Sequence, residues 1–334
     1  GRSKRPERNC RMNSCKAVTP VEAAEFLRQN NDYYLLTHSN PDGDTLGSAY
    51  ALALMLWHLG KRVTVLCADP VPEKFNYFTN VTPGQPAKGP GCAVAVDVAD
   101  AKLLGALAGE YANRVELCID HHVSNTRYAK RLYLNAEAAA NCENIFELAP
   151  LLNYSLTVPA AKALYTGLST DTGCFRYSNT TPRTLRIAAD LCELNINHAE
   201  INRLMFETKS RARLELEKQA LAALQFYYNG KCSVICVTNK MLSSTGCTET
   251  DVEGITANSR CIEGVLVGVT VKQKSDLSFK VSLRSYDPVD SSAICKIFGG
   301  GGHRYAAGCQ FSADHTVEQV RDAVVAAVGK ALGE

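Results

Sequence analysis

Eight aspartate and histidine side chains, grouped at four stations in the first half of the chain, have the types and spacing that best support chemistry. The stations are HSNPDGD (38–44), VAVDVAD (94–100), CIDHH (118–122) and STDTG (169–173). Their acidic and imidazole residues of interest are His38, Asp42, Asp44, Asp97, Asp120, His121, His122 and Asp171. Several carboxylates with a few imidazoles, and no thiolate motif, suit a hard-to-borderline divalent metal such as Mn²⁺.

The first three stations each follow an apolar run that is typical of a buried strand: YYLLT, AVAV and VELCI. In an open α/β sheet the carboxyl ends of parallel strands gather in one crevice, where ligands bind. Stations that are far apart in sequence are therefore expected to meet at one place.

The spacing within the stations favours two metal ions. Asp42 and Asp44 are two residues apart and can face neighbouring metals, with His38 beside Asp42 on the first. Asp97 is a candidate bridge between both ions. His121 and Asp171 are candidates to complete the second site. Two ions roughly 3.5–4 Å apart can activate a water and clamp the oxygens of a phosphoryl transfer.

Each station also has a plainer interpretation. The Pro41-Asp42-Gly43 sequence is typical of a turn, an aspartate after a strand is commonly a helix cap, and Asp171 can lie in a turn. An EF-hand is excluded because the acidic ladder and the terminal Glu are missing. The adjacent histidines after Asp120 are harder to explain as turn chemistry, and the four stations together favour the metal site.

The segment GGGGH (299–303) is the last chemical feature. We expect a flexible loop there, whose glycines allow the backbone of Gly300, Gly301 and Gly302 to approach a ligand closely. His303 is a candidate to stack on a base or bond a phosphate. Arg260 and Arg284 lie on or beside strand-like segments of the same region, and they are candidates for bidentate phosphate recognition or for ordinary surface ion pairs.

The pattern of the chain predicts an α/β protein with an N-terminal doubly wound, mainly parallel sheet. Helices are predicted from Thr19-Pro20 onward and over 45–59, in AKLLGALAGEYA (101–112), and over 139–152, 159–169, 183–194 and 198–206. A helix over 211–226 is expected to connect this part to a smaller α/β module with β-rich segments and a final helix. The expected divisions are a basic leader (1–17), an N-terminal domain with the candidate metal ligands (18–206), a helical connector (207–228) and a C-terminal α/β domain (229–334).

Composition limits the classes of protein that are compatible with the chain. Its 334 residues favour two domains, and 46% hydrophobic with 21% charged residues is ordinary for a globular protein. No apolar run reaches the roughly 18 residues that a membrane span needs, and the N-terminus has no apolar signal core. The fourteen cysteines are scattered without a C-x-x-C pair, so we expect reduced thiols, no zinc site and a cytoplasmic location.

The charge is unevenly placed. Residues 1–16 hold six Lys or Arg and one Glu, a net +5, against +2 for the whole chain, so residues 17–334 carry −3. We expect the basic leader to be disordered, with a nucleic-acid-binding arm as the alternative. The acidic remainder argues against a surface that coats long nucleic acid.

Taken together, these residues resemble the DHH phosphoesterase superfamily, in the subfamily with a DHHA1 C-terminal domain. HSNPDGDTLGS, Asp97, the DHH triplet at 120–122 and STDTGCFRYSNTTP are similar to the family's four motifs in order, and GGGGHRYAAG resembles its substrate-binding motif. The resemblance runs from about residue 18 to 330 and is greatest to the bifunctional oligoribonuclease and pAp phosphatases.

The resemblance implies a role for each residue. His38, Asp42 and Asp97 would hold one Mn²⁺, and the other would be held by Asp44, Asp97, His121 and Asp171. His122 would contact the scissile phosphate as a catalytic and substrate-binding residue beside Asp97, and Asp120 would orient a neighbouring histidine. Arg260, Arg284 and the 300–303 segment would hold the far end of the substrate.

The activity implied is removal of mononucleotides from very short RNA and of the 3′-phosphate from pAp, with no track for long nucleic acid. Alternatives are a phosphodiesterase for cyclic di-AMP or pApA, an inorganic pyrophosphatase, which GGGGH argues against, and a non-catalytic nucleotide-binding regulator. No membrane partner is expected, and a homodimer is one candidate assembly.

Overall fold

The computed structural model describes residues 15–81, 84–252 and 254–334. The chain divides into two compact units, residues 1–208 and 209–334. Most of the expected leader, residues 1–14, lies outside the described residues. None of the described helices is both long and apolar enough to span a membrane.

The first unit contains a parallel sheet of six strands in the order β1-β6-β5-β4-β2-β3. Its strands are β1 (Lys16–Ala17), β2 (Asp32–Leu36), β3 (Arg62–Leu66), β4 (Cys92–Val96), β5 (Val115–Asp120) and β6 (Arg131–Leu134). Its helices are α1 (Pro20–Gln29), α2 (Gly43–His58), α3 (Asn76–Thr79), α4 (Ala108–Tyr111), α5 (Asn141–Leu151), α6 (Val158–Asp171), α7 (Pro182–Glu193) and α8 (His198–Asn202). Short 3₁₀ or π segments are η1 (Glu73–Phe75), η2 (Ala101–Leu107) and η3 (Arg203–Glu207).

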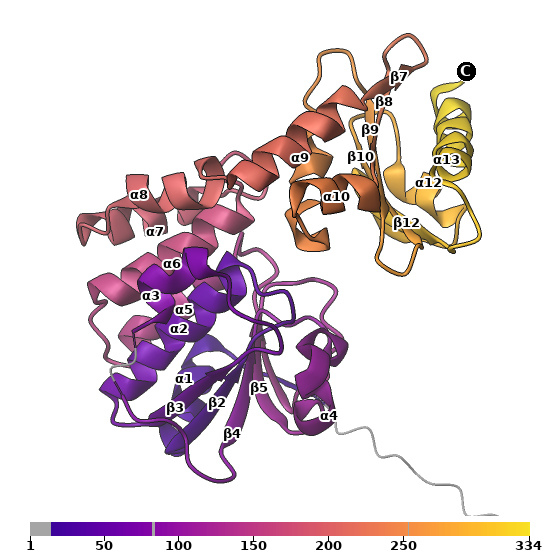
Figure 1. Ribbon diagram of the computed structural model, residues 1–334. Coiled ribbons are helices and arrows are strands. Elements are labelled where there is room, and N and C mark those ends of the chain that lie inside the picture. Colours follow the sequence, from indigo (N-terminus) through magenta and orange to yellow (C-terminus); the bar gives the residue numbers. More distant parts are fainter. Residues whose placement is uncertain (1–14, 82–83, 253) are drawn as a thin grey trace, which may run out of the picture. The chain divides into compact units, whose positions relative to one another are not determined.

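Helices cover both faces of this sheet, as expected for a doubly wound architecture. The helices α1, α2, α5 and α6 lie on one face, and η2 with α4 lies on the other (Figure 1). Side chains alternate along each strand, so Leu35 enters the core under α2 whereas Leu36 enters the core under η2. The predicted fold class is confirmed.

The second unit contains a six-stranded mixed sheet in the order β11-β12-β10-β9-β8-β7. Its strands are β7 (Gln225–Tyr227), β8 (Cys232–Val237), β9 (Val267–Gln273), β10 (Phe279–Ser285), β11 (Gly301–His303) and β12 (Ala306–Phe311). Its helices are α9 (Arg211–Ala222), α10 (Asn239–Thr245), η4 (Glu249–Val252), α11 (Ile255–Asn258), α12 (Ser291–Lys296) and α13 (Val317–Leu332). The helices α9 and α10 pack on one face, and α12 and α13 pack on the other (Figure 1).

Several predicted elements differ from the structure. Lys16 and Ala17, expected in the leader, form β1, because their segment donates backbone hydrogen bonds to Lys130 and Leu132 beside β6. The helix predicted over 101–112 is a 3₁₀ segment followed by one short α-turn, because Gly105 breaks it at a φ of 57°.

Two further differences lie in the second unit. The helix predicted over 211–226 ends at Ala222, and the next residues form β7, which pairs with β8. The expected flexible loop GGGGH ends in strand β11, whose residues pair with β12. In both cases an available strand edge supplies backbone partners that outweigh local preference.

Candidate functional site

The first three stations meet at the carboxyl ends of neighbouring strands. The strands β2, β4 and β5 lie side by side in the sheet. His38 follows β2, Asp97 follows β4 directly, and Asp120 is the last residue of β5. The fourth station joins from a helix, because Asp171 is the last residue of α6.

The first cluster contains His38, Asp42 and Asp97, each of which offers a ligand atom within 4.8 Å of the other two. The His38 Nε2 atom lies 3.5 Å from Asp42 Oδ1 and 3.7 Å from Asp97 Oδ2. Two carboxylates and one imidazole that converge on a common point are a set that can hold a divalent ion.

The second cluster contains Asp44, His121 and Asp171 at the same mutual spacing. The His121 Nε2 atom lies 3.7 Å from Asp44 Oδ2 and 3.5 Å from Asp171 Oδ2. It also lies 3.4 Å from Asp97 Oδ1. Asp97 therefore directs one carboxylate oxygen toward each cluster.

The hydrogen bonding at this site fits a metal ion. Among the described residues, the buried atoms Asp97 Oδ1 and His121 Nε2 have no hydrogen-bond partner. The opposite ring nitrogens are occupied, since His38 Nδ1 lies 2.8 Å from Ser39 O and His121 Nδ1 lies 3.0 Å from Ala138 O. A carbonyl at Nδ1 fixes the tautomer that leaves a bare lone pair on Nε2, which is the usual arrangement of a ligating histidine.

The electrostatics of the cluster also favour a cation. Burial, followed by the neighbouring carboxylates of Asp44 and Asp42, raises the pKa of Asp97 well above its usual range. Burial and the carboxylates of Asp44 and Asp97 raise the pKa of Asp171 in the same way. Ionised carboxylates this close and this buried repel one another, and a divalent ion between them removes the repulsion.

Asp42 is a helix cap and a member of the first cluster at once. Its Oδ1 accepts hydrogen bonds from the backbone N–H groups of Asp44 and Thr45 at the start of α2. Asp97, by contrast, is not the cap that its position after a strand suggested. It has a φ of 60°, and the cap of η2 is Asp100. A non-glycine residue held in the left-handed region often marks a functional site.

Close packing of α2 against α6 positions Asp44. A Cβ atom on Gly47 would lie 2.4 Å from the carbonyl oxygen of Ala163, and one on Gly167 would lie 2.7 Å from Asp44 Oδ1. The fully buried Asp44 carboxylate also accepts backbone N–H groups of Asn141 and Cys142 at the start of α5, at 2.5 and 2.9 Å. Three helices thus hold this one carboxylate in place.

His122 differs from the other two histidines of the site because it contacts a carboxylate through Nδ1. Its Nδ1 lies 2.8 Å from Asp120 Oδ1, and its side chain is 43% exposed. Asp120 is buried and also accepts from the His121 backbone N–H and from Asn125 Nδ2, at 2.8 and 2.6 Å. The imidazole of His122 is therefore fixed in orientation, and its Nε2 remains available to a ligand.

A cavity of about 230 Å³ opens at these residues. Its lining consists of His38, Asp42, Asp97, Leu103, His122 and Asp171. Leu103 and Asn125 were not among the predicted site residues, because neither belongs to a polar motif. Leu103 enters the site from η2, where its carbonyl accepts from the Ser39 N–H at 2.7 Å, and Asn125 enters from the loop that follows the DHH triplet.

Two predicted residues of the second unit, His303 and Arg284, lie on one face of its sheet. His303 pairs with Ala306 on β12, and Ala306 pairs with Arg284 on β10. Arg284 in turn pairs with Gly268 on β9. Side chains directly opposite one another across antiparallel strands project to the same face, so His303 and Arg284 share a surface with only an alanine between them.

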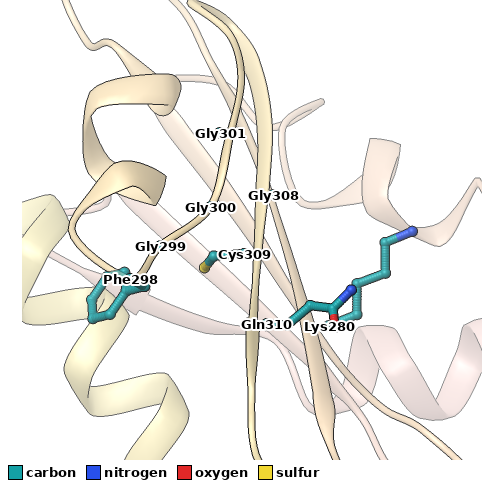
Figure 2. Close-up of a pocket in the computed structure, with 8 residues that line it drawn as sticks. All are labelled: Lys280, Phe298, Gly299, Gly300, Gly301, Gly308, Cys309 and Gln310. Carbon is teal, nitrogen blue, oxygen red and sulfur yellow. The ribbon is translucent and has the colours of Figure 1, made fainter. Parts of the chain in front are cut away.

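The glycine run lies against β12 and lines a second cavity of about 460 Å³. Figure 2 shows Gly299, Gly300 and Gly301 beside this strand, with Phe298 on one side and Lys280 and Gln310 on the other. A Cβ atom on Gly300 would lie 2.2 Å from the carbonyl oxygen of Gly308, and Gly302 has a φ of 143°. These positions require glycine, and they leave exposed backbone that a ligand can approach.

The comparisons with known proteins agree with this fold. Residues 32–168 match the profile described as the DHH family, N-terminal domain, and residues 234–332 match the DHHA1 domain. The chain therefore belongs to the DHH family, in the branch that carries a DHHA1 domain.

Two curated relatives share most of their length with the chain. The bifunctional oligoribonuclease and PAP phosphatase NrnA of Thermus thermophilus is 32% identical over 90% of this chain and 92% of its own. The protein of the same name from Bacillus subtilis is 26% identical over 81% and 86%. Among solved structures, an exopolyphosphatase-related protein from Bacteroides fragilis superposes with a TM-score of 0.82 at 22% identity, covering 93% and 96% of the two chains. The last comparison supports the fold alone.

Proposed function

We propose that this chain is a two-metal phosphoesterase that degrades very short oligoribonucleotides to mononucleotides and removes the 3′-phosphate of pAp. The proposal depends on the orientation of the Asp97 carboxylate, which has one oxygen toward His38 and the other toward His121. An aspartate shared between two ligand sets is the arrangement that two-metal phosphoryl transfer requires. The names of the Thermus thermophilus and Bacillus subtilis relatives supply the substrate class.

The proposed ligands are the two clusters already described, with Asp97 common to both, and Mn²⁺ is the proposed ion. Divalent ions held there supply the Lewis-acid chemistry of phosphoryl transfer and neutralise charge on the phosphate. His122, oriented by Asp120, directs Nε2 at the scissile phosphate and acts with Asp97 as a catalytic residue. Because His122 is partly exposed, a substrate phosphate can reach its ring.

The second unit has the proposed role of holding the nucleotide. Arg284 and His303 present a cation and an imidazole on one face, and the backbone of Gly300 to Gly302 lies next to them. We propose that short substrates are preferred over long ones, since residues 17–334 carry a net charge of −3. Binding of long nucleic acid depends on many phosphate contacts with Lys and Arg.

Turnover of a 5′-phosphorylated RNA dinucleotide, pAp, cyclic di-AMP and pyrophosphate in one buffer tests the proposal. We expect Mn²⁺-dependent release of mononucleotide from the dinucleotide and of phosphate from pAp. Hydrolysis of cyclic di-AMP or pyrophosphate alone would replace the proposed substrate class. Turnover of none of the four would leave a nucleotide-binding regulator as the better assignment.

A further inference from the structure

The half-exposed ring of Tyr286, directly after β10, is in contact with the guanidinium group of Arg260. The side chain of Tyr286 is a large aromatic group with 46% of its surface exposed. The guanidinium carbon of Arg260 lies 4.9 Å from the centroid of its ring. The backbone beneath is fixed, because the Tyr286 N–H donates to the carbonyl of Leu266 at 2.9 Å. An exposed ring with a planar cation against one side is a stacking surface.

Arg260 lies on the same face of the sheet as Arg284. Gly268 pairs with Arg284, and a Cβ atom built on Gly268 would lie 2.8 Å from the backbone nitrogen of Arg260. The segment before Arg260 therefore passes over the face to which Arg284 projects. Since His303 belongs to the same row of residues, Arg260 and Tyr286 extend the face already proposed to hold a nucleotide.

The guanidinium of Arg260 retains an unused donor. Its Nε is buried, and no described residue accepts a hydrogen bond from it. Stacking fixes the plane of a guanidinium group. A guanidinium held in this way can donate two parallel N–H hydrogen bonds to a phosphate. The pair thus offers an aromatic surface with a cationic guanidinium beside it.

A neighbouring pair of the same residue types has a different character. Arg304 lies over the ring of Tyr305 at 5.5 Å, and Tyr305 is 40% exposed. Both side chains are already bound to Asp287: Arg304 Nη2 lies 3.1 Å from its carboxylate, and the Tyr305 hydroxyl lies 3.0 Å from both of its oxygens. This second pair is a satisfied ion-pair cluster, and it provides a matched control.

We propose that Tyr286 is a specificity-determining residue that stacks on a nucleobase of the substrate, while Arg260 binds the adjacent phosphate. The inference rests on the proposed function and adds to it the group that recognises the base. Stacking on an aromatic ring tolerates every base, because each has a π-face. The site would therefore accept short RNA of any sequence and discriminate against phosphate esters without a base.

Calorimetric binding of AMP and of ribose 5-phosphate tests this without turnover. We expect the wild type to bind AMP roughly 5- to 100-fold more tightly than ribose 5-phosphate. Tyr286→Ala should reduce this ratio to near one by weakening AMP alone, whereas Tyr286→Phe should keep it. Tyr305→Ala, the matched control, should also keep it, and the melting temperature of each variant verifies folding.

Two results would overturn the inference. A Tyr286→Ala protein that retains the preference for AMP shows that the base is recognised elsewhere. Equal weakening of both ligands in this variant shows that Tyr286 only supports Arg260. Dinucleotide turnover by the wild type is measured in parallel and tests the proposed function separately. If the wild type is active and Tyr286→Ala keeps the preference for AMP, the stacking role alone is rejected.

Discussion

The buried carboxylate of Asp120, the last residue of β5, lies 2.8 Å from the Nδ1 atom of His122. This contact fixes the tautomer and direction of the imidazole proposed to touch the scissile phosphate. The two carboxylate oxygens of Asp120 accept hydrogen bonds from His122 Nδ1 and Asn125 Nδ2. In Asp120→Asn only one of these two acceptors remains, because the other becomes an NH₂ group. We expect Asp120→Asn to lower kcat on pAp by about 10- to 100-fold.

Steady-state kinetics with saturating Mn²⁺ measure this effect. The control is Asp100→Asn, because Asp100 caps η2 through a backbone N–H that Asn also accepts. Similar kcat values for Asp120→Asn and the wild type would show that the contact is structural only.

The charge of Asp97 should destabilise the protein without metal and stabilise it with metal. Burial and neighbouring carboxylates raise the pKa of Asp97, so its ionised form is disfavoured in the folded state. The metal-free protein is therefore more stable when Asp97 is protonated. Its free energy of unfolding decreases as the pH rises through the raised pKa of Asp97. Asp97→Asn removes the charge, and Asn tolerates the φ of 60° at this position.

Melting temperatures with EDTA and with Mn²⁺ distinguish the two effects. In EDTA at neutral pH, Asp97→Asn should melt at or above the wild-type temperature, and the difference should shrink as the pH falls. In Mn²⁺ the wild type alone should gain stability, in line with ligand linkage. A variant that is less stable in EDTA and still stabilised by Mn²⁺ would contradict the shared-carboxylate arrangement.

The two adjacent histidines should separate metal binding from chemistry. His121 Nε2 faces Asp44, Asp97 and Asp171, whereas His122 faces the cavity and contacts Asp120. We expect His121→Ala to lose bound Mn²⁺ and activity together. His122→Ala should retain Mn²⁺ and lose at least 100-fold in kcat.

Metal content after dialysis, measured by plasma mass spectrometry, reports the first quantity, and initial rates report the second. Loss of Mn²⁺ from His122→Ala to the same degree as from His121→Ala would place both histidines in the metal site and remove the proposed division of roles.

Neighbouring glycines of the GGGGH segment should respond differently to alanine. Gly302 has a φ of 143°, and a Cβ there would lie 2.6 Å from the carbonyl oxygen of Ala306, whereas a Cβ on Gly301 would meet nothing within 4 Å. Gly302→Ala should therefore weaken AMP binding and lower stability by about 1–3 kcal/mol, with Mn²⁺ binding unchanged. Gly301→Ala should fold with near wild-type stability. Chemical denaturation and calorimetry measure these effects, and equal stability of the two variants would contradict the strand geometry of β11.

Much of the first unit could be predicted because its elements are long and strongly patterned. The apolar runs before His38, Asp97 and Asp120 are strands β2, β4 and β5, and parallel pairing alone brings their ends together. The supporting residues could not be found this way. Asn125 reaches the site through an irregular loop and Leu103 through the 3₁₀ segment η2, and no polar motif marks either residue.

Three of the strands that were not predicted, β1, β7 and β11, have a common cause. β1 has two residues, and β7 and β11 have three each, so none is long enough to show an alternating pattern. Each exists because a longer neighbour offers unpaired backbone groups. The prediction of a flexible loop is therefore wrong for Gly301, Gly302 and His303, which form β11.

Gly47 of α2 and Gly167 of α6 allow these two helices to pack closely beside the metal site. Asp44 belongs to the first turn of α2 and Asp171 ends α6, so the distance between these two carboxylates depends on how closely the helix axes approach. A side chain added at Gly47 or Gly167 would push the two helices apart, since its Cβ atom would meet the Ala163 carbonyl of α6 or Asp44 of α2. Gly47 and Gly167 thus help to determine the spacing of the metal ligands although they bind no metal. Substitutions at these glycines are therefore expected to change metal preference while every ligand is kept.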